Sequence, residues 1–188
     1  MDSLDEVAAE VRGCTLCRLA QTRTQAVPGA GKPDADLVLI GEAPGRTEDE
    51  VGRPFQGMAG RFLNTALSGL GVGRDDIFVT SVNKCRPPGN RNPRRDEISA
   101  CAPYLDRQLA LLAPRVVLAM GGTAAARLHP DASGRAVKVA DLRGQIHPLG
   151  PDRALIVTYH PASAMRFPAQ RQPFLDDLEE AARLAGLV

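Results

Sequence analysis

Four short apolar runs, separated by stretches of helical pattern, constrain the fold of this chain most. The runs cover residues 36–40, 77–82, 115–120 and 154–158. They are apolar on both faces, which is typical of parallel strands that are covered by helices on both sides. Helical spacing of apolar residues occurs at residues 59–70, 96–112 and 173–187. The pattern predicts an α/β fold with a mainly parallel sheet joined by right-handed crossovers.

Length and charge limit the class of protein further. A chain of 188 residues is expected to form one domain over residues 1–188, and no linker-like stretch suggests a boundary. Its net charge of +1 does not by itself indicate a nucleic-acid-binding protein, although it is compatible with a local basic patch. The acidic start lacks the features of an export signal. The apolar residues 109–120 are interrupted and fall short of the ~18 that a membrane span needs, so we expect a cytoplasmic protein.

Four cysteines, Cys14, Cys17, Cys85 and Cys101, are the only ones in the chain. In a reducing compartment, metal ligation is a better interpretation than disulfide bonding. Cys14 and Cys17 form a C-x2-C elbow, whereas Cys85 follows a predicted strand and Cys101 lies in a predicted helix. Four thiolates suit either a structural zinc ion or an iron–sulfur cluster, and the spacing does not choose between them. The alternative is that Cys85 and Cys101 are simply buried thiols.

Three of the predicted strands are followed by unusual turns. They read GEAPG at residues 41–45, NKCRPP at 83–88 and YHPAS at 159–163. Ligands of such sheets bind beyond the carboxyl ends of the strands. The three turns are therefore expected to meet in one cleft.

These turns, the segment GRPF at residues 52–55 and the four cysteines together resemble the family 4 uracil-DNA glycosylases. The resemblance runs from about Cys14 to the terminal helix. It implies a three-layer α/β/α sandwich around a four-stranded, mainly parallel sheet. It also implies a [4Fe-4S] cluster on Cys14, Cys17, Cys85 and Cys101, and hydrolytic removal of uracil from DNA. The implied partner is uracil-containing DNA, bound by a monomer.

The resemblance assigns roles to four side chains around a uracil flipped out of the DNA. His160 would donate a hydrogen bond to O2 of the departing base, and Glu42 would orient water or stabilise positive charge on the sugar. Phe55 would stack on the base. Glu48 would crowd C5 of the base and so exclude the methyl group of thymine. His129 and His147, which each precede a proline, are expected to be surface or capping residues.

One position departs from the family pattern. Relatives carry an asparagine three residues before the Lys-Cys pair, where this chain has Ser81. A hydroxyl group cannot offer the paired donor and acceptor of an amide. Asn83 would share the face of Ser81 if the strand persisted, displaced by roughly 6–7 Å. We therefore expect an active enzyme with altered selectivity, whose base pocket is lined by Gly41, Ala43, Ser81 and Asn83.

Two segments are predicted to contact DNA. The first is a cationic loop that would neutralise phosphates, made of Lys84, Arg86, Arg91, Arg94 and Arg95. The second follows His160 and comprises Ala164, Met165 and Arg166, with Met165 as an apolar wedge that fills the gap left by the flipped base.

Two alternatives are weighed against this interpretation. One is a relative that captures uracil covalently through a histidine in the loop after the second strand. Residues 86–100 contain no histidine, and Ala43 stands where that relative has glutamine, so we discount it. The other is a non-catalytic iron–sulfur or zinc protein that binds nucleic acid or carries electrons.

Overall fold

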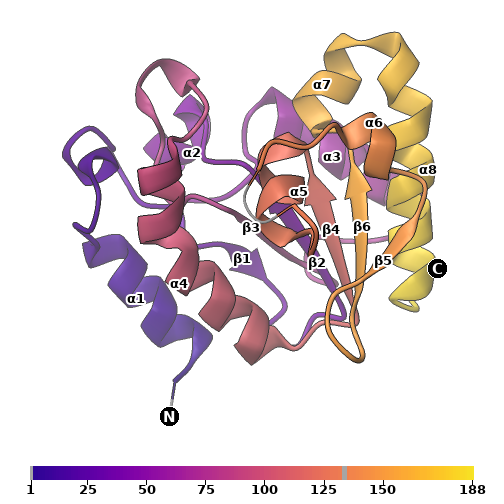
Figure 1. Cartoon of the computed structure of the whole chain (residues 1–188), viewed down its shortest axis with the longest axis horizontal. Helices are drawn as coiled ribbons and strands as arrows, with labels where there is room; N and C mark the ends of the chain where they lie inside the picture. Colours follow the sequence, from indigo (N-terminus) through magenta and orange to yellow (C-terminus); the bar gives the residue numbers. More distant parts are fainter. Residues whose placement is uncertain (1, 133–134) are drawn as a thin grey trace.

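The computed structural model describes residues 2–132 and 135–188. Its described part contains a six-stranded sheet with the strand order β1-β3-β2-β4-β6-β5 (Figure 1). The four central strands pair in parallel. They are β2 (Leu37–Gly41), β3 (Phe78–Ser81), β4 (Val116–Met120) and β6 (Ala154–Thr158). Each corresponds to one of the four apolar runs of the sequence.

The prediction of a four-stranded sheet was wrong in the number of strands. β1 (Ala30–Gly31) pairs antiparallel with β3, and β5 (Ile146–Pro148) pairs antiparallel with β6. These edge strands have two and three residues, and all of their residues are exposed or half-buried. Strands this short carry no apolar run or alternation, so the pattern that identified the four central strands could not reveal them.

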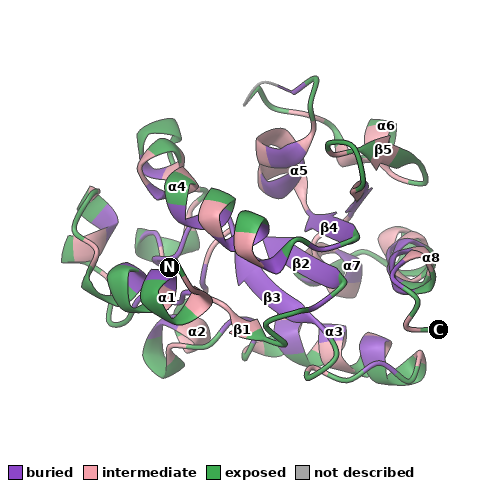
Figure 2. Cartoon of the chain, turned by 90° about the horizontal axis from the view of Figure 1, so that it is seen from below, coloured by how far each residue is buried: buried purple, intermediate pink, exposed green. Residues whose placement is uncertain are grey.

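Helices cover both faces of the sheet, which confirms the three-layer arrangement (Figure 2). Leu37 and Leu39 face one layer, and Val38 and Ile40 between them face the other, as the alternation of a strand requires. The first layer contains α3 (Met58–Gly69), α7 (Pro161–Arg166) and α8 (Pro168–Leu184). The second contains α4 (Arg95–Leu112) and α5 (Gly122–Leu128).

The terminal helix begins earlier than predicted, at Pro168 instead of residue 173. Pro168 occupies the first turn, where the backbone N–H that proline lacks has no helical partner, and the helix also accommodates Pro173. No helix among residues 2–132 and 135–188 is both long and apolar enough to cross a membrane.

Shorter elements complete the described structure. α1 (Leu4–Gly13) lies against α4 (Figure 1). The others are α2 (Arg46–Val51), α6 (Val139–Leu142) and 3-10 turns at Arg18–Gln21 and Pro88–Asn90. α1 was not predicted, and it brings the N-terminal cysteines beside α4.

Candidate active site

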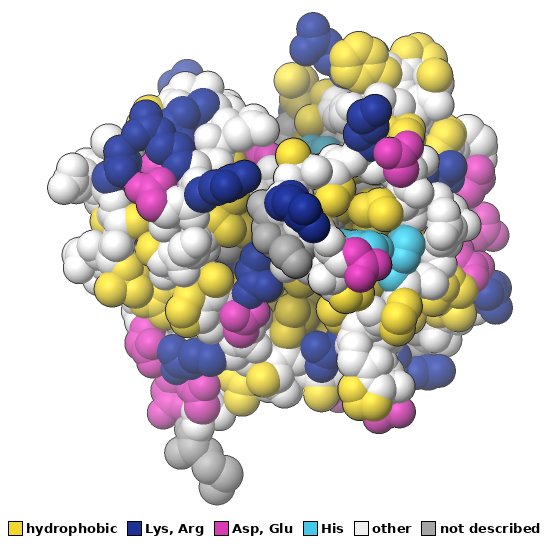
Figure 3. Space-filling view, in the orientation of Figure 1, with side chains coloured by type: hydrophobic (Ala, Val, Ile, Leu, Met, Phe, Trp, Pro, Cys, Tyr) yellow, Lys and Arg dark blue, Asp and Glu magenta, His cyan; other side chains and the backbone are white. Residues whose placement is uncertain are grey.

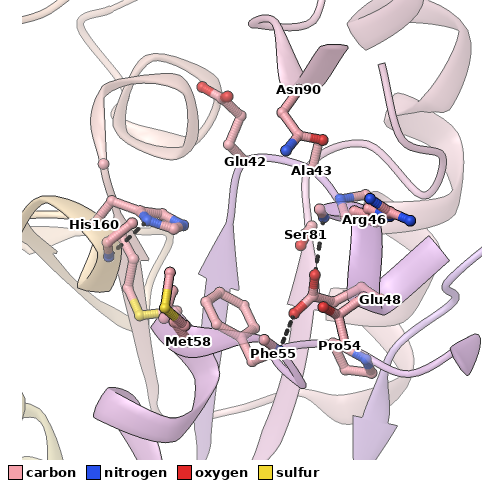
Figure 4. A pocket seen from close by; sticks show the side chains of 18 of the residues that line it. Glu42, Ala43, Arg46, Glu48, Pro54, Phe55, Met58, Ser81, Asn90 and His160 are labelled. Carbon is pink, nitrogen blue, oxygen red and sulfur yellow. Dashed lines mark hydrogen bonds between the residues drawn. The ribbon is translucent and has the colours of Figure 1, made fainter. Parts of the chain in front are cut away.

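A cavity of about 600 Å³ opens at the carboxyl ends of the parallel strands (Figure 4). The three turns predicted to meet do meet here. Many of the predicted site residues line the cavity: Glu42, Ala43, Glu48, Phe55, Ser81, Arg91, His160 and Met165. Its volume and its place at the carboxyl ends of the strands are those of a small-molecule binding site.

His160 follows β6 and forms the N-cap of α7, with Pro161 at the first helical position. The backbone N–H of Ala162 donates to its Nδ1 at 3.2 Å. Since Nδ1 is thereby an acceptor, the proton of the neutral ring lies on Nε2. Burial lowers the pKa of His160 to about 4, with a smaller opposing effect from Glu48. At neutral pH the side chain is therefore an uncharged Nε2–H donor in the wall of the cavity.

The lowered pKa of His160 predicts an acid-sensitive stability. The unfolded chain binds a proton at the ordinary pKa of 6.5, whereas the folded chain resists protonation down to about pH 4. The stabilising contribution is therefore complete above pH 6.5 and is lost as the pH falls from 6.5 towards 4. Urea unfolding is measured for wild type and His160→Gln at pH 7 and pH 5. Between these pH values, the free energy of unfolding is expected to fall by about 1–2 kcal/mol more in wild type than in the variant. Equal falls in the two proteins would contradict the lowered pKa of His160.

Phe55 forms the floor of the cavity in a strained backbone conformation. Its φ is 53°, in the left-handed region that non-glycine residues rarely adopt. Its ring lies 5.8 Å from the ring of His160, at an interplanar angle of 28°. A Cβ on Gly41 would lie 2.6 Å from the Phe55 ring, and a Cβ on Gly60 would lie 1.9 Å from the Phe55 carbonyl oxygen. Gly41 therefore leaves room for the aromatic ring under the end of β2, and Gly60 leaves room for the backbone of Phe55 against α3.

Glu48 closes the loop that carries Phe55. Its Oε1 accepts from the backbone N–H groups of Gln56 (2.7 Å) and Gly57 (2.8 Å), and its Oε2 accepts from that of Gly45 (3.1 Å). The carboxylate therefore ties the start of α2 to the start of α3. Sequence reasoning considered this side chain only as a barrier to thymine, and the loop closure it provides was missed.

The carboxylate of Glu42 accepts a short hydrogen bond from the hydroxyl group of Thr123 on α5. Thr123 was not predicted, because the sequence analysis considered the turns after three strands and not Gly121-Gly122-Thr123, the turn after β4. The same argument that selected the other three turns would have selected it. Gly121 has a φ of 94°, and a Cβ there would lie 3.2 Å from that of His160, so this turn packs directly against the histidine.

Asn90 also lines the cavity and was missed (Figure 4). It lies in the 3-10 turn after two prolines, with a φ of 55°. Its Oδ1 accepts from Nε of Arg86 at 2.6 Å. The sequence signal was the Gly-Asn pair that follows two prolines, because asparagine tolerates the left-handed conformation of such a turn better than most residues do.

Ser81 lines the cavity at the end of β3, but Asn83 does not, and the prediction that Asn83 binds the base was wrong. The side chain of Asn83 is buried beside the cysteines, where its Nδ2 donates to the carbonyl oxygen of Glu97 at 2.9 Å. β3 ends at Ser81, so the strand alternation that would have returned Asn83 to the face of Ser81 does not continue. The amide therefore cannot stand in for the asparagine of the relatives.

Two predicted DNA contacts, Lys84 and Ala164, were also wrong. Lys84 is 1% exposed, and its Nζ donates to the Thr80 hydroxyl, the Ser81 carbonyl and the Gln108 side chain. Ala164 is fully buried in the core between α7 and the sheet. Neither side chain is accessible to a phosphate.

The rest of the cationic loop is accessible, and Figure 3 shows Lys and Arg side chains gathered over the chain that precedes α4. Arg91 donates through both terminal nitrogens to the buried carboxylate of Glu97, at 2.6 and 2.8 Å. That ion pair holds the pKa of Glu97 at about 2. Arg94 and Arg95 are exposed and Arg86 is half-buried. The free positive charge of the loop therefore lies mainly on Arg86, Arg94 and Arg95.

The four cysteines line one small cavity between α1, α4 and the end of β3. Nη1 of Arg23 donates to Sγ of Cys85 at 3.0 Å, and the backbone N–H of Lys84 donates to Sγ of Cys101 at 3.2 Å. Burial raises the pKa of Cys101 to about 11, so a metal must displace its proton. Among residues 2–132 and 135–188, no three acidic, His or Cys side chains are close enough to hold one metal ion. The four cysteines of this one cavity are the donor set that a [4Fe-4S] cluster takes, so the residues present fit that group.

The fold and the cavity define an α/β enzyme-like protein with its ligand site at the carboxyl ends of a parallel sheet. The sequence model of the Uracil DNA glycosylase superfamily matches residues 28–182, and the chain belongs to that family, in its type-4 branch. It is 46% identical to the type-4 uracil-DNA glycosylase of Pyrobaculum aerophilum, over 89% of this chain and 87% of the relative. It is 41% identical to the type-4 uracil-DNA glycosylase of Sulfurisphaera tokodaii, over 98% of this chain and 86% of the relative. The type-5 uracil-DNA glycosylase of Thermus thermophilus is 35% identical, over 86% of this chain and 81% of the relative.

Proposed function

We propose that this chain is a uracil-DNA glycosylase that flips uracil out of DNA and hydrolyses its N-glycosidic bond, which initiates base excision repair. The observation that carries the proposal is the cavity in which Phe55, Glu42 and the neutral His160 meet. The named relatives support the substrate. We propose further that residues 1–188 act as one domain and as a monomer, on DNA in the cytoplasm.

His160 is the catalytic residue that stabilises the departing base. Breaking the glycosidic bond leaves negative charge on uracil, and this charge is shared by O2. A neutral Nε2–H donor is suited to the task because its hydrogen bond strengthens as the charge develops and no proton has to be transferred. The hydrogen bond from Ala162 keeps Nδ1 an acceptor and so keeps that proton on Nε2.

Glu42 stabilises the positive charge that develops on the sugar as the base departs. The same carboxylate, at the cavity wall, orients a water molecule for attack on the sugar. The hydrogen bond from Thr123 fixes one oxygen of Glu42, which leaves the other for water. Phe55 stacks on the flipped base and holds its plane, while Ser81 and Ala43 line the pocket. Gly41 contributes by leaving room for the Phe55 ring.

The remaining assignments concern DNA and the metal group. Arg86, Arg94, Arg95 and Arg166 contact phosphates, with Arg91 beside them in its ion pair with Glu97. Met165, half-buried at the cavity rim, enters the gap in the duplex. Cys14, Cys17, Cys85 and Cys101 hold a [4Fe-4S] cluster. When bound, this group cross-links the N-terminal segment to α4 and the end of β3. Glu48 limits access at C5 of the base.

Excision assays test the proposed function. The purified holoprotein is incubated in excess with oligonucleotides that contain U·G, U·A, single-stranded U, hypoxanthine or T·G. We expect release of uracil and no release of thymine. A protein that contains the cluster and binds the oligonucleotides but releases no base would instead support the non-catalytic binding protein.

Ser81→Asn tests how the pocket reads the base. An amide at this position adds a donor and an acceptor beside the uracil edge, and one buried hydrogen bond contributes about 1–3 kcal/mol. We expect the ratio of uracil to cytosine excision, measured as single-turnover rates, to rise about tenfold. The matched variant Ser81→Ala removes only the hydroxyl group and should lower the uracil rate. If neither variant changes rate or base preference, the base is read elsewhere.

A further inference from the structure

Lys84 is the most unusual buried charge in the described part of the chain. Its side chain is 1% exposed, and it is the largest of the fully buried side chains. Nζ donates to Oγ1 of Thr80 at 2.6 Å, to the carbonyl oxygen of Ser81 at 2.7 Å and to Oε1 of Gln108 at 2.7 Å. All three donors of the ammonium group are thus satisfied.

None of these three acceptors carries a charge. Within residues 2–132 and 135–188, no carboxylate lies within 4.0 Å of Nζ. A buried ammonium group without an anion is costly, even when it is fully hydrogen-bonded.

The cysteines, which become anions when they bind a metal group, lie beside this lysine. Lys84 lines the cysteine cavity, and its backbone N–H donates to Sγ of Cys101. Four thiolates on an iron–sulfur cluster give that group a net negative charge, and charge near a cluster tunes its reduction potential.

We propose that Lys84 is the buried counter-cation of the cysteine-bound cluster, and that the same ammonium group fixes the end of β3 at the base pocket. The ammonium group fixes the end of β3 through its hydrogen bond to the Ser81 carbonyl oxygen. This bond acts on the base pocket because the Ser81 side chain lines the cavity that takes the base. One residue thus joins the metal site to the active site. The inference rests on the proposed cluster.

Two variants separate the charge of Lys84 from its hydrogen bonds. Lys84→Met removes both at nearly constant volume. Gln108→Glu keeps Lys84 and places a carboxylate where Oε1 of Gln108 lies 2.7 Å from Nζ, so it neutralises the ammonium group and keeps the hydrogen bond to Ser81. Lys32→Met, which changes a lysine that is 47% exposed, is the matched control.

The readouts are the midpoint potential of the cluster in the holoprotein, its rate of loss to a chelator, and the single-turnover rate of uracil release. Both Lys84→Met and Gln108→Glu should shift the potential to more negative values and speed cluster loss about tenfold, unlike Lys32→Met. The uracil rate should fall about tenfold in Lys84→Met and stay within about threefold of wild type in Gln108→Glu. If Lys84→Met does not fold, Gln108→Glu alone decides.

An unchanged potential and an unchanged rate of cluster loss in the folded variants would overturn the inference. The proposed function would survive that result, because wild type would still hold the cluster and release uracil. Iron and sulfide missing from the wild-type protein as purified under anaerobic conditions would instead refute the cluster itself.

Discussion

Replacing His160 with alanine is expected to lower the single-turnover rate of uracil release by about 10²–10³-fold, because the imidazole that lines the cavity would be lost. Binding of the uracil oligonucleotide should change little, since the hydrogen bond strengthens only as the base departs. The expected result is a fall in the maximal single-turnover rate, with a nearly constant enzyme concentration at half of that rate. Rates are measured with enzyme in excess, so that product release does not mask the chemical step.

Two further variants make the His160 result specific. His160→Gln retains an N–H donor and should recover part of the lost rate. His147→Ala is the matched control, because His147 lies in β5 and bonds to His129 and the Leu142 carbonyl, outside the cavity. A His160→Ala enzyme within about threefold of wild type would show that another group supports the departing base.

Cys101→Ala is expected to abolish cluster binding and to lower the free energy of unfolding by on the order of 4 kcal/mol. Cys101 lies on α4 and faces a small core that joins α1 to the rest of the protein, with Val7, Val11 and Leu19 fully buried. Without the cluster, this core loses the cross-link between the N-terminal elbow and α4. Limited proteolysis should then cut within residues 1–24 before it cuts the sheet.

Ser99→Ala controls for a change on the same helix, because Ser99 is exposed and lies outside the cysteine cavity. Bound iron and sulfide, the visible absorption of the cluster and urea unfolding are measured for both variants. Wild-type iron content in Cys101→Ala would contradict the assignment of this thiol as a ligand.

The central fold was predictable from sequence because its strands are buried on both faces. Residues such as Leu37 to Ile40 must all be apolar when helices cover both sides of the sheet, and that requirement leaves a visible run. The residues of the edge strands β1 and β5 need not be apolar, because helices do not bury them on both faces. Their pairing depends on where the chain returns to the sheet, which a local pattern does not record.

The site was predictable in position and only partly in detail. The turns after β2, β3 and β6 converge because parallel strands end at one edge, and this argument needs no side-chain geometry. The predictions for Asn83 and Lys84 were wrong, because the direction of a side chain just beyond a strand depends on how the backbone turns there. Lys84 also looked like a surface charge, since sequence alone gives no sign of the buried acceptors that satisfy it.

A structure of the protein bound to DNA that contains a non-hydrolysable uridine analogue tests the central claim most directly. The account predicts the flipped uracil within the cavity, its plane against the Phe55 ring and its O2 about 2.7–3.2 Å from Nε2 of His160. A base held elsewhere on the protein, or a His160 side chain turned away from O2, would contradict it.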